Sequence, residues 1–256
     1  MTRRRLAAYG VHVLTASGIA FMFLAAAEMT RPDPRAWLVF VWFLGATLVD
    51  AIDGPLARWA KVKEYARSID GRTIDDLVDY IGFSFLPLLL IWRMGWVPGG
   101  ESIWAGVWVV IPMLASLLGF AHQHAKAEEE GFFRGFPSYW NIVALYAGLS
   151  AALLGDAGLW LNGVLLIGLA ILTVSPVWLI YPNLCPKPWK PLVLYGSYAW
   201  ALLLLAMLPW FPDDVPGWLV LLSLIYPAFY LVLSLSLRKQ WPTRPSREDE
   251  ARVKSG

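Results

Sequence analysis

Apolar runs long enough to cross a lipid bilayer recur along the whole 256-residue chain, each interrupted by charged or Pro/Gly-rich segments. Hydrophobic residues make up 58% of the chain and charged residues only 16%, whereas soluble domains carry about 25% charged residues. A membrane-spanning helix needs about 20 apolar residues. The pattern therefore predicts an all-α polytopic membrane protein with eight transmembrane helices. We expect these at about residues 7–28, 36–54, 75–94, 102–123, 139–155, 158–181, 192–210 and 217–237.

The first apolar run, from Leu6 to Ala27, follows three arginines and resembles a secretory signal peptide. It is longer than the roughly 7–15 residues of a signal-peptide core, so we interpret it as the first span. The spans form one predicted catalytic domain over residues 1–237, followed by a charged cytoplasmic tail over 238–256. The single cysteine, Cys185, excludes an intramolecular disulfide and a cysteine-only metal site.

Positive charges predict how the helices are oriented, because Lys and Arg collect in cytoplasmic loops. If the N-terminus is cytoplasmic, all 21 Lys and Arg residues except Arg31, Arg35 and Arg93 fall on the cytoplasmic side. An even number of spans keeps the basic tail on that side, so we expect both termini in the cytoplasm. The net charge is only +2 and no basic patch is interleaved with stacking aromatics, which argues against nucleic acid as a partner.

Four aspartates break the apolar pattern where the second and third spans reach the cytoplasm. Asp50 and Asp53 are three residues apart and Asp75 and Asp79 are four apart, so each pair lies on one face of its helix. A carboxylate inside a membrane is costly unless it is paired or bound to a cation. Antiparallel neighbouring helices bring the two pairs together, and divalent cations prefer such oxygen ligands. We therefore predict a metal site; a buried polar network or a transporter's ion pathway is the alternative.

The residues between the two pairs suit a phosphate ligand. Gly54 and Ala57 leave the helix surface bare, and Gly71 offers a second bare spot on the facing helix. Pro55 removes a helical hydrogen bond, so we expect a kink there. Arg58 carries a permanently charged planar fork that suits a pyrophosphate. These residues predict a nucleotide bound beside the metal site.

The pattern Asp-x2-Asp-Gly-x2-Ala-Arg, a spacer, then Gly-x3-Asp-x3-Asp resembles the signature of the CDP-alcohol phosphotransferase family. The motif occupies residues 50–79, and every fixed position is present: Asp50, Asp53, Gly54, Ala57, Arg58, Gly71, Asp75 and Asp79. The chain departs from most members in its longer spacer, twelve residues between Arg58 and Gly71, and in its eight predicted spans. In both respects it is similar to a bacterial branch that condenses CDP-diacylglycerol with choline, giving phosphatidylcholine and CMP.

The resemblance implies a metal-dependent transferase that uses two Mg²⁺ or Mn²⁺ ions. Their main ligands would be Asp50, Asp53 and Asp75, while Asp79 would complete the shell and act as general base toward the acceptor hydroxyl. Arg58 would assist catalysis. The residues implied to hold cytidine diphosphate are Asp50, Gly54, Ala57, Arg58, Gly71 and Asp75. The resemblance also implies a site facing the cytoplasm in a bacterial inner membrane, and homodimers, which are common in the family.

Choline would be recognised through its quaternary ammonium, which binds best over aromatic faces. The aromatic residues expected near cytoplasmic helix ends are Tyr80, Tyr139, Trp140 and Tyr181. The loop after the fourth span carries three glutamates at 128–130 but only Lys126 and Arg134 as cations, which favours a cationic or neutral alcohol. The alternatives are a synthase for phosphatidylserine or phosphatidylglycerol phosphate, and a cation transporter.

Overall fold

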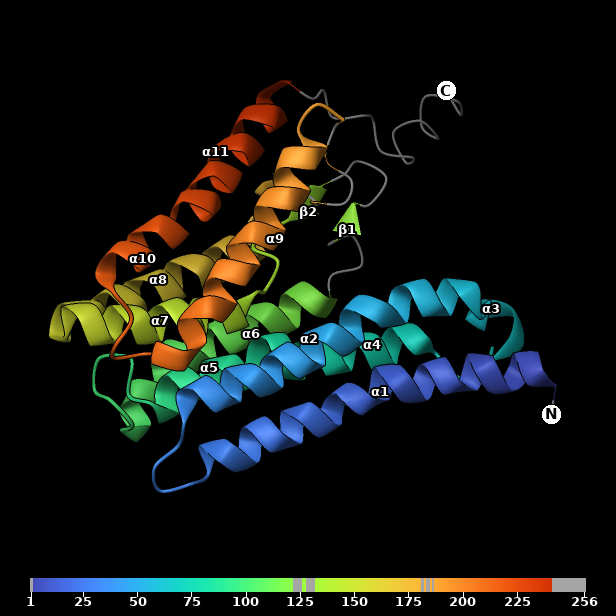
Figure 1. The fold of residues 1–256 in the computed structure, drawn as a ribbon, viewed down its shortest axis with the longest axis horizontal. Helices are drawn as coiled ribbons and strands as arrows, with labels where there is room; N and C mark the ends of the chain where they lie inside the picture. The colour runs from blue at the N-terminus through green and yellow to red at the C-terminus, as the bar shows by residue number, and fades with distance from the viewer. Residues whose placement is uncertain are drawn as a thin grey trace, which may run out of the picture.

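Helices dominate the computed structural model, which describes residues 2–121, 126–127, 132–180, 182, 185 and 187–240 (Figure 1). The α-helices are α1 (Arg3–Met29), α2 (Ala36–Trp59), α3 (Val62–Tyr65), α4 (Gly71–Asp79), α5 (Leu86–Arg93), α6 (Val107–Ala121), α7 (Trp140–Leu154), α8 (Asp156–Val174), α9 (Lys190–Met207), α10 (Gly217–Ser223) and α11 (Ile225–Gln240). Among the described residues, three tighter or wider helical turns adjoin them: the π-helix η1 (Tyr80–Phe85) and the 3-10 helices η2 (Ile103–Gly106) and η5 (Leu208–Trp210). The predicted predominance of helix is confirmed.

Within the described residues, six helical segments are long and apolar enough to cross a membrane, so the chain is an integral membrane protein. They run Arg3–Met29, Ala36–Trp59, Ile103–Ala121, Asp156–Val174, Lys190–Trp210 and Gly217–Leu237. Each coincides with a predicted span. The other two predicted spans correspond to α4, η1 and α5, which follow one another without a break, and to α7, which is apolar but shorter. α11 continues to Gln240, and the rest of the expected tail, 241–256, lies outside the described residues.

α1 and α2 pack against each other as an antiparallel hairpin along one side of the molecule (Figure 1). Glu28, which is only 7% exposed, closes the hairpin by accepting two hydrogen bonds from the Arg35 guanidinium at 2.9 and 3.0 Å. Arg93, the last residue of α5, donates to the carbonyls of Met29 and Arg31 at 3.0 and 2.8 Å. Bonds of this bidentate, charge-assisted kind are strong and directional. They fasten one end of α1, α2 and α5 together.

Asp70 caps the start of α4. Its carboxylate accepts a hydrogen bond from the Thr73 hydroxyl at 2.9 Å and one from the Arg72 backbone N–H at 3.0 Å, which satisfies groups that a helix start leaves unpaired. These bonds, with that of Thr73 the larger influence, hold the pKa of the Asp70 carboxyl below its usual value. The cap therefore fixes where α4 begins, at Gly71, which is also the first residue of the second half of the aspartate motif.

The helix widens into η1 directly after Asp79. Its wider hydrogen bonding is seen at Leu86, whose N–H reaches the carbonyl of Ile81, five residues back. Pro87 follows and has no N–H with which to close the tighter bond to the carbonyl of Phe83. π-helical turns are rare and occur frequently at functional sites. This one lies next to the aspartates.

A small antiparallel sheet connects the helices, in the order β1 (Lys126–Ala127), β2 (Phe132–Arg134) and β3 (Trp178–Ile180). The predicted span 158–181 is therefore too long, because α8 ends at Val174 and Ser175 is already extended. The residue before a proline avoids the helical conformation, and Pro176 follows Ser175. The strand escaped prediction because its apolar residues continue the hydrophobic run of the preceding helix.

The core between the helices contains a polar group whose hydrogen bonds are all made. Asn162 on α8 is buried; its Nδ2 donates to the carbonyls of Trp96 and Ala147 at 2.7 and 2.9 Å. Its Oδ1 accepts from the Ser150 hydroxyl at 2.5 Å. Trp96 in turn packs edge-on against Phe211, with ring centroids 5.8 Å apart. Asn162 therefore joins α8 to α7 and to the segment after α5.

Replacing Asn162 with Leu should lower the stability of the purified protein in detergent by about 1–3 kcal/mol, because buried partners lose their hydrogen bonds. Thermal unfolding measures this change. Asn141→Leu is the matched control. The Asn141 side-chain oxygen accepts a hydrogen bond from the backbone N–H of its immediate neighbour, Ile142, at 2.9 Å, so it joins no separate elements. Equal losses in both variants would contradict the interpretation.

Candidate metal centre and active site

Three of the four motif aspartates meet in the structure. One carboxylate oxygen each from Asp50 on α2 and from Asp75 and Asp79 on α4 lies within 4.8 Å of the others, and all three side chains are partly buried. Like charges this close repel unless a positive charge lies among them. A set of carboxylate oxygens is what hard divalent cations such as Mg²⁺ and Mn²⁺ bind. The donor chemistry therefore fits a divalent metal.

Asp53 lies three residues after Asp50 on the same face of α2, but it does not belong to this group of three. It is 7% exposed, and it forms no ion pair with the described residues. A buried carboxylate without a counter-charge is costly, so this side chain also suits a nearby cation. The structure thus brings three of the four together and leaves the metal-ligand role of Asp53 a prediction.

α2 continues across Pro55 as far as Trp59. Gly54 and Ala57 are partly exposed and Arg58 is exposed, so this turn of α2 is accessible. A Cβ atom on Gly54 would lie 3.6 Å from Arg58 Nη1, because the guanidinium folds back over the glycine. The missing side chain at position 54 and the charged fork at 58 therefore share one surface, as the motif predicts for a nucleotide site.

Gly71 differs from the expectation of an open spot on α4. A Cβ atom there would lie 2.7 Å from Cε1 and 3.0 Å from Nδ1 of His12 on α1, so the buried imidazole fills the space beside the glycine. Sequence reasoning missed His12. The signal was present, because a single histidine inside the otherwise apolar first span needs a reason for its burial.

The π-helix η1 packs among α1, α2, α6 and α7, immediately beyond Asp79. Its first residue, Tyr80, donates a hydrogen bond to the carbonyl of Met113 at 3.3 Å and meets the ring of Phe120 edge-on at 6.0 Å. Ser84 is fully buried, and its hydroxyl has no hydrogen-bond partner within the described chain. η1 thus attaches the aspartate-bearing helix to the centre of the bundle.

The other predicted choline residues fall in different environments. Tyr139 is 42% exposed and Trp140 is fully buried. The Trp140 indole donates to the Ser116 hydroxyl at 2.6 Å, and its ring packs edge-on against Phe136 at 5.1 Å. A ring enclosed in this way has no face open to a ligand in this structure. Tyr181 lies outside the described residues.

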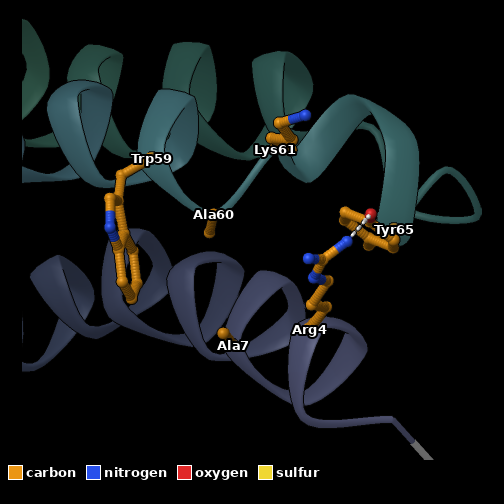
Figure 2. Close-up of a pocket in the computed structure, with 6 residues that line it drawn as sticks. All are labelled: Arg4, Ala7, Trp59, Ala60, Lys61 and Tyr65. Atoms are coloured by element: carbon orange, nitrogen blue, oxygen red, sulfur yellow. Dashed lines mark hydrogen bonds between the residues drawn. The ribbon is translucent and has the colours of Figure 1, made fainter.

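A hollow of about 300 Å³ lies at the end of α2 that carries Arg58, between the starts of α1 and α3 (Figure 2). Its lining residues are Arg4, Ala7, Trp59, Ala60, Lys61 and Tyr65. Figure 2 shows the Arg4 guanidinium reaching Tyr65, to whose hydroxyl it donates at 3.0 Å. None of the four aspartates lines the hollow. Two cationic side chains do, Arg4 and Lys61, and they lie at the same end of α2 as Arg58.

Comparison with known proteins identifies the class. Residues 11–175 match the model of the CDP-alcohol phosphatidyltransferase family, so the chain belongs to that family, as the motif predicts. Its members are enzymes that transfer a group from a CDP-alcohol to an acceptor alcohol and generally use a divalent metal. The matched region contains all four aspartates and His12.

Relatives of established name narrow the class. The chain is 31% identical to the phosphatidylcholine synthase of Pseudomonas aeruginosa over 221 residues, which cover 86% of this chain and 87% of that protein. It is 32% identical to the phosphatidylcholine synthase of Rhizobium johnstonii over 235 residues, 90% of each chain. The phosphatidylcholine synthase of Rhizobium meliloti is 34% identical over 220 residues, 83% of each. No solved structure matches the chain.

Gly71→Ala should destabilise the protein, because the added methyl group would meet the buried ring of His12. Adding His12→Ala in the same chain should remove the conflict, so the two substitutions should be strongly non-additive in thermal unfolding. Gly10→Ala on α1 is the control: a Cβ atom there meets nothing within 4 Å, so it should be neutral or slightly stabilising. Additive effects of Gly71→Ala and His12→Ala would contradict the packing.

Proposed function

We propose that this chain is a phosphatidylcholine synthase, which transfers the phosphatidyl group of CDP-diacylglycerol to choline and releases CMP. The observation that carries the proposal is the meeting of Asp50, Asp75 and Asp79 within a complete family motif. The choice of choline is supported by the similarity to phosphatidylcholine synthases over 86–90% of this chain.

In the proposed centre, two Mg²⁺ or Mn²⁺ ions would be held by Asp50, Asp53, Asp75 and Asp79. Bound divalent cations would neutralise the pyrophosphate and the charge on the departing CMP. Cytidine diphosphate would lie against Gly54 and Ala57, with Asp50 and Asp75 contributing. Gly71, which the sequence also assigns to this site, has the His12 ring against its open side and would act through that ring. The exposed Arg58 guanidinium, folded over Gly54, is suited to hold a phosphate oxygen in a bidentate manner.

The transfer step needs one proton acceptor. Asp79 takes the proton of the choline hydroxyl, and the choline oxygen forms a bond to the phosphorus that carries diacylglycerol. The bond from this phosphorus to the bridging oxygen breaks, and CMP leaves with that oxygen. Asp79 suits this role because it is partly buried and closest in the chain to η1, whose first residue, Tyr80, carries an aromatic ring.

Aromatic faces near the centre would bind the choline ammonium. Tyr80 and Tyr139 are the better candidates, since Tyr80 is partly exposed and Tyr139 is 42% exposed, whereas Trp140 is enclosed. Tyr181 remains a candidate on sequence grounds alone. In this proposal the acceptor approaches from the cytoplasm, and its positive charge is drawn to the carboxylates.

The proposal includes eight membrane spans. Both termini and the active site would lie on the cytoplasmic side of a bacterial inner membrane. The continuous stretch from Gly71 to Arg93 and the apolar helix α7 would supply the two spans beyond the six long segments. The distribution of Lys and Arg supports this orientation. A homodimer is proposed by analogy with the family.

Labelling of single cysteines in a Cys185→Ser background tests this topology. With a membrane-impermeant maleimide, Asp33→Cys and Asp213→Cys should react in intact spheroplasts, while Lys63→Cys should react only after permeabilisation. All three native positions are exposed, so access to the reagent is comparable. Asp213 distinguishes the two topologies, because it would lie on the cytoplasmic side if α7 did not cross the membrane. Its protection in intact spheroplasts would exclude eight spans.

Purified protein with CDP-diacylglycerol and Mn²⁺ or Mg²⁺ should release CMP when choline is added, and EDTA should abolish the release. Asp79→Asn should slow it by about 10²–10⁴-fold, the contribution typical of a general base. Asp76→Asn is the matched control, since Asp76 lies outside the group of three and pairs with Arg72 at 3.6 Å. Release with serine or glycerol phosphate instead would identify a sister synthase. Cation movement without CMP release would identify a transporter.

A further inference from the structure

His12 on α1 is a buried polar residue that the chemistry above leaves without a role. It is 5% exposed, and its Nε2 atom has no hydrogen-bond partner within the described part of the chain. Roughly 90% or more of buried polar groups in proteins have a partner, because leaving one unpaired costs free energy. An unpaired imidazole nitrogen beside a motif glycine therefore points to a ligand that supplies the missing hydrogen bond.

α1 runs parallel to the stretch that carries Asp75 and Asp79, in a constant register. Four contacts along this stretch join residue pairs 59 or 60 positions apart: Tyr9 with Ser68, His12 with Gly71, Gly18 with Val78 and Met22 with Gly82. Asp75 therefore falls level with residues 15–16 of α1. His12 lies about one helical turn from that level, roughly 5 Å along the axis, on the side where α1 and α4 begin.

The side on which α1 and α4 begin is the cytoplasmic side in the proposed topology. The acyl chains of a CDP-diacylglycerol donor are anchored in the bilayer, so its cytidine monophosphate portion extends toward water. His12 thus lies on the nucleotide side of the carboxylates. An imidazole nitrogen acts as donor or acceptor according to its tautomer, and so suits a ribose hydroxyl or a phosphate oxygen.

We propose that His12 binds the cytidine monophosphate portion of the donor through Nε2 and positions it against the metal centre. The inference rests on the proposed function for the donor, but not on the choice of acceptor. Gly71 then has an indirect part: its lack of a side chain lets the His12 ring lie against α4. The motif glycine serves the nucleotide by making room for the residue that binds it.

The test uses the full chain in detergent with Mn²⁺, measuring CMP binding by calorimetry and the KM values of CDP-diacylglycerol and choline. His12→Phe keeps a ring over Gly71 but loses the nitrogen, so CMP binding should weaken about tenfold, with a matching rise in the donor KM. The choline KM should not change. His12→Gln, whose amide nitrogen reaches the Nε2 position, should recover most of the loss, whereas His12→Asn should not.

Thr15→Val is the control on the same buried face of α1, since the Thr15 hydroxyl already bonds the Val11 carbonyl at 3.3 Å. It should leave CMP binding unchanged. Wild-type CMP affinity in His12→Phe would overturn the inference, even if thermal stability fell, because the role would then be packing alone. A rise in the choline KM with unchanged CMP affinity would also overturn it.

If His12→Phe does not fold, the Gln and Asn variants decide: equal CMP affinity in the two overturns the inference. Failure of the proposed function gives a different result. A wild-type protein that binds CMP but releases none with choline overturns the choline assignment, while the comparison of His12 variants by CMP binding remains valid.

Discussion

Oxygens of Asp50, Asp75 and Asp79 lie within 4.8 Å of one another in a protein built largely of apolar helices. Two unit charges about 4 Å apart repel by about 1 kcal/mol in water and by about 4 kcal/mol at the effective dielectric near a protein surface. Three such charges, with Asp53 buried one helical turn away on α2, repel one another in the folded state, and a bound cation would offset this repulsion. The approach of Asp50 on α2 to Asp75 and Asp79 on α4 would therefore be coupled to the binding of metal, since each would make the other more favourable.

The scaffold around the carboxylates resists this repulsion from both ends. At one end, Glu28, Arg35 and Arg93 tie together α1, α2 and the end of α5 through charge-assisted bonds. At the other, Arg4 reaches Tyr65 in the segment that joins α2 to α4. Between them α1 lies against α4 and η1 at a constant register. α1 carries none of the motif aspartates, yet it determines where the helix that carries two of them can lie.

Features of the fold and site that depend on residues close in the sequence were predictable, and those that depend on contacts between distant segments were not. Asp75 and Asp79 share a face because helical periodicity alone requires it, and the apolar spans follow from their length. The partner of Gly71 was not predictable, because the missing side chain indicates only that something approaches closely; in the structure this is the ring of His12. The burial of Trp140 likewise depends on α6, which is distant in the chain. The short strand after α8 was hidden because its apolar residues suit a helix equally well.

The π-helix after Asp79 affects how the stretch from Gly71 to Arg93 should be aligned with the sequences of relatives. A wide turn accommodates one more residue than an α-helical turn, and one residue corresponds to a rotation of about 100° at 3.6 residues per turn. The segment after η1 therefore presents a different set of side chains to the bundle than a continuous α-helix would. A deletion of one residue within 80–85 would reverse such a rotation. Relatives with an unbroken helix here would be aligned correctly only with a one-residue gap beyond the aspartates.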